Sequence, residues 1–263
     1  GDQMSFREKS PEKVVAELVE MHRRHGIARF LMADNIMPHS YHKTLIHVLR
    51  SRADKFDIFY EQKANLTLGQ VQQLAEAGVR CIQPGIEALS SRTLKLMRKG
   101  VTARQNINLL RYCRVANVAV NWNLLYGLPS DHAEDYRATM SIMPALAHLQ
   151  PPRYACALNI DRYSPYFDKA NEFGIANVVP QEPYRSVLPA HADATRIAYH
   201  FDGKYISGSL DDPSLASDLR STVEQWQSQW SAERRPILHV SQISDDVWVV
   251  MDTRRSNEVV ESA

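Results

Sequence analysis

The sequence contains few cysteines, and their spacing does not match the common metal-binding frameworks. The three cysteines among the 263 residues, Cys81, Cys113 and Cys156, lie far apart along the chain. This arrangement fits reduced thiols and lacks the close spacing of a zinc or iron–sulfur motif. Cys81 and Cys156 also fall in apolar, strand-like segments, where cysteine usually acts as a small hydrophobic residue. We therefore expect no metal site among the cysteines of this chain.

Long apolar runs and an excess of one charge are also missing. No run approaches the ~18 apolar residues that a membrane span needs, and no signal-peptide pattern is recognisable. The 31 Lys and Arg residues balance 30 Asp and Glu residues, so the net charge is +1. Such a balance leaves no electrostatic footprint for nucleic acid or a membrane surface. We expect a cytoplasmic protein that binds neither of these partners.

Helices and short apolar strands alternate between residues 10 and 164. In the first helix, Ser10 is the expected N-cap, Pro11 suits the first helical position and Gly26 ends the apolar stripe. Helices are predicted over residues 10–26, 39–53, 67–78, 91–100, 102–117 and 131–149, and strands over 27–35, 56–66, 79–87, 118–129 and 153–164. This alternation predicts βαβ units and a parallel sheet, either open or rolled into a barrel. No Gly-rich nucleotide fingerprint follows a strand, which disfavours a nucleotide-binding open sheet.

Polar residues end all five predicted strands. They are Asp34 and Asn35, Glu61 and Lys63, Glu87, Asn123 and Tyr126, and finally Asn159, Asp161 and Arg162. In α/β barrels the reactive groups gather at the carboxyl ends of the strands. For any single such residue a solvated loop is the better explanation, and Glu61 and Lys63 could simply pair on one face of their strand. Five strand ends in succession favour a site.

The pattern changes after residue 164. Residues 164–189 are rich in Pro and Asn and are predicted to form an ordered loop, followed by helices over 192–201 and 214–233. Residues 236–255 are predicted to form two strands about the polar turn at 243–246. Trp226 and Trp230 lie four apart on one helix face, which is typical of packing. We therefore divide the chain into a barrel domain, residues 1–168, and a small α+β appendage, residues 169–263.

Several stretches together resemble one known family. The segments "QPGIEALSSRTLKLMRKGVT", "VNWNLLYGLPSDHAEDY", "FYEQKANL" and "DRYSPYF" are similar to the radical S-adenosylmethionine (SAM) superfamily. More narrowly, they resemble its cobalamin-dependent C-methyltransferases, which mature ribosomally synthesised peptide natural products. The resemblance covers nearly the whole chain. It implies an α/β fold, a partial TIM-like (β/α)6 barrel, of which this chain would carry strands 2–6 because the array opens with a helix.

The chain departs from that family in one respect. Family members carry a C-x3-C-x2-C motif just ahead of the helix that corresponds to "FREKSPEKVVAEL", and its thiolates hold a [4Fe–4S] cluster. Neither this motif nor the cobalamin-binding domain is found in the sequence, which starts at Gly1. We therefore expect a fragment that is inactive by itself.

The resemblance also implies a chemistry. In the intact family member, SAM is cleaved to a 5′-deoxyadenosyl radical that abstracts hydrogen from carbon, and methylcobalamin donates the methyl group. Cluster and cobalamin carry these steps, while the protein binds and orients. The implied partners are a precursor peptide and an electron donor such as a flavodoxin or ferredoxin.

By the same resemblance, the strand-end residues hold SAM. Asp34 and Asn35 would receive its amino group, Glu87 would contact the ribose or the methionine end, and Glu61 and Lys63 are further candidates for cofactor binding.

The last two strands complete this predicted site. Asn123 and the "LLYG" backbone would hold the adenine, and Asn159 and Arg162 would lie near the adenine or the carboxylate. Tyr126 and Tyr163 are candidates to face the substrate, although aromatic residues at a barrel mouth more often serve packing.

Three alternatives stay open. One is another radical reaction on a peptide. A second is an α/β-barrel lyase in which Lys63 forms a Schiff base. A third is a non-catalytic module in which residues 169–263 bind a peptide, for example by strand addition.

Overall fold

Six parallel strand segments follow one another in chain order through the computed structural model, which describes residues 8–34, 36–189, 191–254 and 260–262. The first four form one sheet, in the order β1 (Arg29–Leu31), β2 (Asp57–Gln62), β3 (Val79–Pro84) and β4 (Ala119–Val120). After a break at residues 121–123 the last strand continues as β5 (Leu124–Tyr126), which pairs in parallel with β6 (Ala155–Ala157). A bridge between Glu87 and Leu124 joins the two sheets. The predicted parallel α/β fold is confirmed.

The helices between these strands cover one face of the sheet. They are α1 (Pro11–His25), α2 (Leu45–Ser51), α3 (Leu68–Glu76), α4 (Ser91–Leu96), α5 (Ala103–Ala116) and α6 (Ala133–Ile142), with 3-10 turns at His39–His42 and Met143–Leu146. Helix α1 begins and ends as predicted, because the Ser10 side chain accepts from the Lys13 N–H and Gly26 adopts a φ of +66°. Capping boxes begin α3 and α5 at Thr67 and Thr102.

Strand β2 shows how the two faces of the sheet differ. Ile58 and Tyr60 are buried in the main core, whereas Phe59 and Glu61 alternate with them and remain partly exposed on the other face. A strand presents successive side chains to opposite faces. The helix-covered face therefore holds the fold together, while the concave face stays available for a ligand. Strand β1 pairs only with β2 among the described residues, and the absence of a preceding barrel strand stays a prediction.

The segment after residue 164 differs from its prediction. The expected loop over 164–189 is wrong, because it contains α7 (Pro165–Asp168), a 3-10 turn (Ala170–Phe173), β8 (Ala176–Pro180) and α8 (Pro183–Val187). The expected helix over 192–201 forms only as α9 (Ala194–Ile197) and then turns into β9 (His200–Lys204), which pairs antiparallel with β8 and with β7 (Ile160–Asp161). Phe201 packs there with Ile160 and Ile175 in a second, small core. This burial outweighs the local helix propensity.

The last helix returns to the main core. In α10 (Leu215–Ser231), Trp226 is buried, stands edge-to-face against Trp122 at 6.1 Å and donates its indole N–H to the Leu149 carbonyl at 2.9 Å. The helix is confirmed, and so are the two strands after it, β10 (Leu238–Ser244) and β11 (Val247–Asp252). A third strand, β12 (Val260–Ser262), was not predicted. Helix α10 shares the core of the parallel sheet. The predicted domain boundary at residue 168 stays a prediction.

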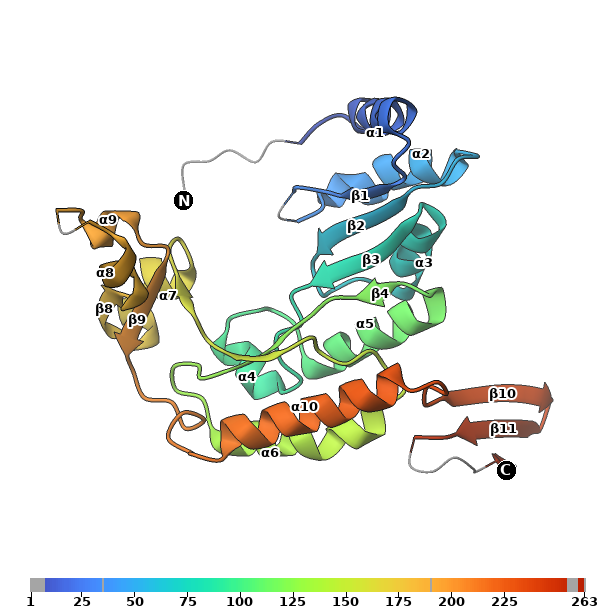
Figure 1. The fold of residues 1–263 in the computed structure, drawn as a ribbon. Coiled ribbons are helices and arrows are strands. Elements are labelled where there is room, and N and C mark those ends of the chain that lie inside the picture. The colour runs from blue at the N-terminus through green and yellow to red at the C-terminus, as the bar shows by residue number, and fades with distance from the viewer. Residues whose placement is uncertain (1–7, 35, 190, 255–259, 263) are drawn as a thin grey trace.

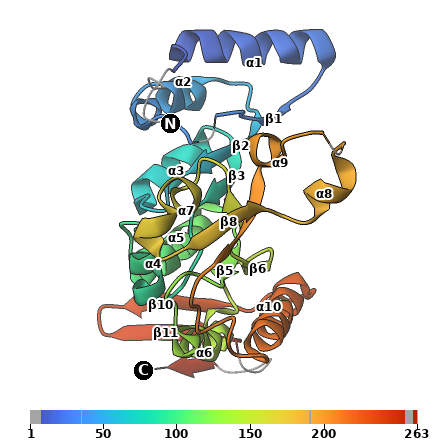
Figure 2. The same cartoon turned by 90° about the vertical axis from the view of Figure 1, so that its left-hand side faces the viewer.

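These elements form an open crescent (Figure 1). One arm contains β1–β3 with α1–α3, the other contains β7–β9 with α7–α9, and α4, α6 and α10 lie at the base. The view turned by 90° places the second arm in front of the parallel sheet (Figure 2). Within the described residues, each helix is too short or too polar to cross a bilayer.

Candidate functional site

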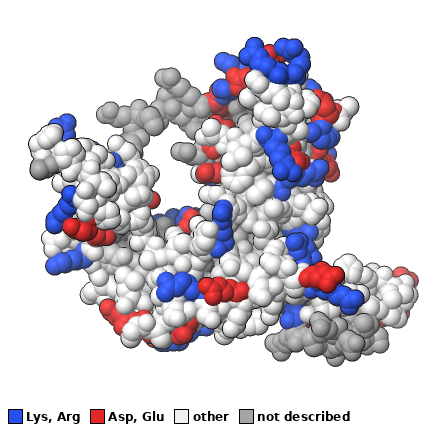
Figure 3. All heavy atoms as spheres, viewed as in Figure 1, with Lys and Arg blue, Asp and Glu red and all other residues white. Residues whose placement is uncertain are grey.

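A cavity of about 860 Å³ lies at the carboxyl ends of β2, β3 and β4. Figure 1 shows these strands pointing toward the hollow between the two arms, and the space-filling view shows that hollow open to solvent (Figure 3). Four of the predicted strand-end residues line the cavity: Glu61, Lys63, Glu87 and Asn123. The structure therefore brings together the predicted residues of three neighbouring strand ends.

Glu87 is held at this cavity in an unusual backbone conformation. Its φ is +58°, in the left-handed region that a non-glycine residue rarely adopts. The buried Asn106 side chain on α5 donates to the carbonyls on both sides of it, Ile86 O and Ala88 O, each at 2.9 Å. The Glu87 carbonyl itself accepts from the Leu125 N–H at 2.8 Å. Such strain persists only where the surroundings fix it, and it concentrates at functional sites.

Lys99 was not predicted, yet its ammonium lies 3.0 Å from the Glu87 carboxylate and lines the same cavity. A Schellman motif after α4 places Lys99 where its side chain reaches Glu87. The Lys99 N–H bonds to Leu94 O at 3.1 Å, and the N–H of Arg98, with a φ of +55°, bonds to Lys95 O at 3.0 Å. That motif usually has glycine where Arg98 stands, so the local pattern did not reveal it. The pair lies against Gly85, where a Cβ atom would come within 3.2 Å of the ammonium.

The remaining lining residues give the cavity a mixed polar character. Among the ion pairs that the structure describes, none joins Glu61 to Lys63, so the alternative in which the two simply pair is not borne out. Asn123 is exposed at the break between β4 and β5, and Arg153 adds a further cation. A ligand here meets carboxylates, cations and an amide together.

The predicted residues after β1 contribute differently. Asp34 does not line the cavity. Its carboxylate accepts a hydrogen bond from the Tyr60 hydroxyl. Burial and this contact raise the pKa of Tyr60, so the tyrosine stays a neutral donor. Asn35, the other residue expected to receive an amino group, lies outside the described residues.

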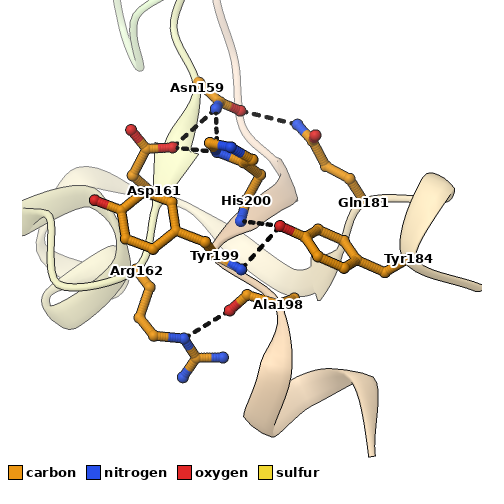
Figure 4. A network of polar contacts seen from close by, with 8 residues as sticks. All are labelled: Asn159, Asp161, Arg162, Gln181, Tyr184, Ala198, Tyr199 and His200. Atoms are coloured by element: carbon orange, nitrogen blue, oxygen red, sulfur yellow. Dashed lines mark hydrogen bonds and ion pairs between the residues drawn. The ribbon is translucent and has the colours of Figure 1, made fainter. Parts of the chain in front are cut away.

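Asn159 belongs to a separate polar network in the second arm (Figure 4). Its amide N–H donates to the Asp161 carboxylate at 2.8 Å, and its amide oxygen accepts from Gln181 at 2.8 Å. His200 places Nδ1 2.7 Å from the same Asp161 oxygen. These partners use both ends of the Asn159 amide and hold β7, β8 and β9 together. His200 was missed because its segment was predicted to be helical.

Arg162 faces the small core rather than the cavity. Its Nε donates to the Ala198 carbonyl at 2.7 Å (Figure 4). Its guanidinium carbon lies 5.0 Å from the centroid of the Phe201 ring and 5.2 Å from that of Phe167. Arg162 therefore does not line the cavity, and its role in cofactor binding stays a prediction. Of the two candidate catalytic tyrosines, Tyr126 is buried and Tyr163 is exposed, and neither lines the cavity.

The "LLYG" backbone was expected to hold an adenine. At Gly127, its N–H and carbonyl groups already have hydrogen-bond partners within the protein. Its N–H donates to the Ser209 hydroxyl at 2.8 Å, and its carbonyl accepts from the Tyr205 hydroxyl at 2.9 Å. The buried Asp131 carboxylate completes this junction by accepting from Ser207 at 2.7 Å and from Ser209 at 2.6 Å. Burial would raise the pKa of Asp131, but these hydrogen bonds outweigh it and hold the pKa below its ordinary value.

Residues 2–143 match the model of the radical SAM superfamily. The chain belongs to the radical SAM superfamily. It is 24% identical over 144 residues to the uncharacterized methyltransferase PH0819 of Pyrococcus horikoshii, covering 54% of this chain and 31% of that protein. The chain thus spans about a third of this relative.

Two solved structures share the fold of this radical SAM protein. One is the cobalamin-dependent S-adenosylmethionine radical enzyme OxsB with aqua-cobalamin bound, at 13% identity and a TM-score of 0.58, covering 86% of this chain and 37% of that one. The other is the radical S-adenosylmethionine methyltransferase TsrM of Kitasatospora setae with cobalamin and a [4Fe–4S] cluster bound, at 17% identity and a TM-score of 0.62, covering 82% and 47%.

Membership of this superfamily implies SAM and a [4Fe–4S] cluster. The cavity fits SAM, because carboxylates, ammonium groups and amides face it together. The cysteines do not fit the cluster. Cys113 is buried on α5, where burial raises the pKa of its thiol to about 12, and burial also raises the pKa of Cys81 and Cys156. Within the described part of the chain, no three His, Cys, Asp or Glu side chains gather as a metal site.

Proposed function

We propose that this chain is the SAM-binding barrel of a longer radical enzyme that methylates a carbon atom of a peptide natural-product precursor. The single observation that carries the proposal is the cavity at the strand ends, in which the Glu87–Lys99 ion pair faces Glu61, Lys63 and Asn123. SAM is a zwitterion at its methionine end, so it needs both an acid and a cation within one cavity. When bound, it would supply a deoxyadenosyl group for radical chemistry.

Each residue of the cavity has a role that follows from its chemistry. Lys99 and Glu87 lie in hydrogen-bond contact, and a bound SAM would replace this contact with contacts to its own carboxylate, ammonium or ribose hydroxyls. Asn123 presents an amide that can both donate to and accept from an adenine edge. Asn106 fixes the backbone around Glu87 from outside the cavity, and Gly85 leaves room in the lining for the Lys99 ammonium.

The cluster and the methyl donor would come from outside these residues. The unsuitable cysteines and the share of its relatives that the chain covers both support a longer protein, with cobalamin carried elsewhere and a flavodoxin or ferredoxin as electron donor. The methyl transfer is supported by the name of PH0819 and the described activity of TsrM. The peptide substrate rests on the sequence resemblance alone, and the chain by itself is expected to be inactive.

Direct binding of SAM to the 263-residue chain tests this proposal. Isothermal titration should show one saturable site in the wild type. Lys99→Met removes a charge-assisted hydrogen bond, which is worth ~1.5–3 kcal/mol, so SAM should bind roughly tenfold to a hundredfold more weakly. Glu87→Gln should weaken binding in the same range.

The matched control is Lys95→Met, an exposed lysine on α4 that does not line the cavity. It should leave SAM affinity within about twofold of the wild type. The proposal is wrong if the wild-type chain binds no SAM, or if Lys95→Met weakens binding as much as Lys99→Met. The superfamily match favours SAM over a Schiff base at Lys63.

A further inference from the structure

A second, smaller cavity of about 220 Å³ lies at the opposite end of the parallel sheet, where β3 and β4 begin. Helices α5 and α10 both end beside it, on the side away from the hollow between the arms (Figure 1). Its polar lining consists of Arg80, Arg114, Asn117, Gln150 and Arg235. The cavity shares Val120, Gln150 and Trp230 with a neighbouring cavity on the concave face, and it contains none of the SAM candidates.

Every polar side chain in this lining can donate hydrogen bonds, and no acid belongs to it. The Gln150 amide oxygen accepts from the Val120 N–H at 2.9 Å, which leaves the amide N–H groups of Gln150 for the cavity. Cys113 also lines it, and burial raises the pKa of this thiol to about 12, so it carries no charge at neutral pH. The lining of this cavity therefore suits a ligand that accepts hydrogen bonds.

Two of the arginines lie against the same aromatic ring. The guanidinium carbons of Arg114 and Arg235 lie 5.0 Å and 4.7 Å from the centroid of the same Trp230 ring. Neither forms an ion pair with the acids of the described residues. Arg80 has one such neighbour, Asp57 at 4.0 Å, and Asp57 also contacts Arg29 at 3.4 Å.

The helix ends do not cancel this positive charge. A helix C-terminus carries roughly half a negative charge, so α5 and α10 together offset about one of the three arginines. Asp57, which Arg80 shares with Arg29, offsets part of a second arginine. The remaining positive charge has no acid in the lining, and like charges brought together are unfavourable without a counterion. Arginine's planar fork of donors matches the oxygens of a phosphate group.

We propose that this cavity binds a phosphate group, either as the free ion or as the monoester of a small ligand. This site is independent of the proposed function, because it uses other residues at the other end of the sheet. Arg114 and Arg235 would hold the oxygens from the Trp230 side, and Arg80 would close the site from β3. The cavity is large enough for the phosphate group and too small to enclose a nucleotide.

Isothermal titration of the full 263-residue chain with inorganic phosphate at low ionic strength tests the site, because salt screens such attractions. A single saturable site is expected. Arg114→Gln and Arg235→Gln should each weaken it about tenfold or more, since each removes a charge-assisted contact. The matched control is Arg104→Gln, an exposed arginine in the first turn of α5 that does not line the cavity. It should stay within about twofold of the wild type.

A nucleoside 5′-monophosphate in place of phosphate separates the two sources. Tighter binding of the monophosphate assigns the site to an ester, and tighter binding of phosphate assigns it to the free ion. The proposal is overturned if the wild type shows no saturable phosphate binding, or if Arg104→Gln weakens binding as much as the other two variants. Quenching of Trp230 fluorescence, absent in Trp230→Phe, provides a second readout. Arg235→Gln keeps the test decisive if Arg114→Gln fails to fold, because Arg235 lies beyond the end of α10.

Discussion

Replacing Asn106 with leucine should both destabilise the fold and loosen the candidate site. The Asn106 amide is fully buried and donates to two carbonyls, Ile86 O and Ala88 O, that lie on either side of Glu87. Ile86 and Ala88 are themselves buried, so water cannot replace the lost donor. A buried acceptor left without a partner costs about 1–3 kcal/mol. Ile86 O keeps the Ala88 N–H as a donor, so the change removes the donor to Ala88 O and predicts a loss of about 1–3 kcal/mol in the free energy of unfolding.

The same change should reach the ligand through Glu87. A left-handed φ costs a non-glycine residue about 1–3 kcal/mol, and the surroundings must supply that energy. Without the two hydrogen bonds from Asn106, Glu87 can relax toward negative φ and carry its carboxylate away from Lys99. SAM should then bind about tenfold more weakly at a temperature where the variant remains folded, because the acid–cation pair is no longer in place.

Urea unfolding followed by circular dichroism gives the stability change, and isothermal titration gives the SAM affinity. Asn108→Leu is the matched control. Among the described residues, the Asn108 side chain on the same helix accepts one hydrogen bond, from the nearby Arg111 at 3.0 Å, and its loss should cost about 0.5 kcal/mol or less. An unchanged urea midpoint for Asn106→Leu would refute the reasoning about the two carbonyls. A lowered midpoint with unchanged SAM affinity would limit Asn106 to supporting the fold.

Two further predictions concern charged and titratable groups away from the cavity. Burial and the nearby Arg254 lower the pKa of His148 to about 4. As the pH falls, the unfolded chain therefore protonates His148 before the folded chain does. The free energy of unfolding, at its full value above pH 6.5, should fall by about 1–2 kcal/mol between pH 7 and pH 5. Urea midpoints should show this slope in the wild type and its loss in His148→Gln; an equal slope in both would assign it to other groups. Asp131→Asn should cost about 3 kcal/mol, because an amide cannot accept all the hydrogen bonds that converge on this buried carboxylate. A thermal midpoint equal to that of the wild type would contradict this expectation.

Local signals were sufficient for the parallel part of the fold. Helix periodicity, together with caps such as Ser10, Thr67 and Thr102, marked the helices, and short apolar runs marked the strands between them. Side chains at the carboxyl ends of adjacent parallel strands must share one edge of a sheet, so Glu61 and Glu87 could be placed at one site from their positions alone.

The remaining features depend on contacts between distant segments. In the sequence, Arg162 cannot be told apart from any other polar residue at a strand end. In the structure, residues 195–201 lie over it and accept its hydrogen bonds. The segment around His200 has a helical composition, yet it becomes a strand because Phe201 is buried against Ile160 and Ile175. Lys99 reaches Glu87 only because Arg98 tolerates a left-handed conformation. None of these contacts leaves a periodic signal in the sequence.

The conformation of Arg98 has a further consequence, because it links the candidate site to the second arm. The Arg98 guanidinium lies 2.7 Å from the Glu172 carboxylate and 4.3 Å from the centroid of the Phe173 ring, both in the arm formed by residues 165–204. The next residue, Lys99, pairs with Glu87 in the cavity. The same turn therefore anchors the arm with one cation and presents the other to the ligand. A displacement of the arm would pull on Arg98 and, through the shared peptide bond, move the Lys99 ammonium relative to Glu87. We therefore expect binding of a large substrate between the arms and binding of SAM in the cavity to influence each other, since both depend on this turn.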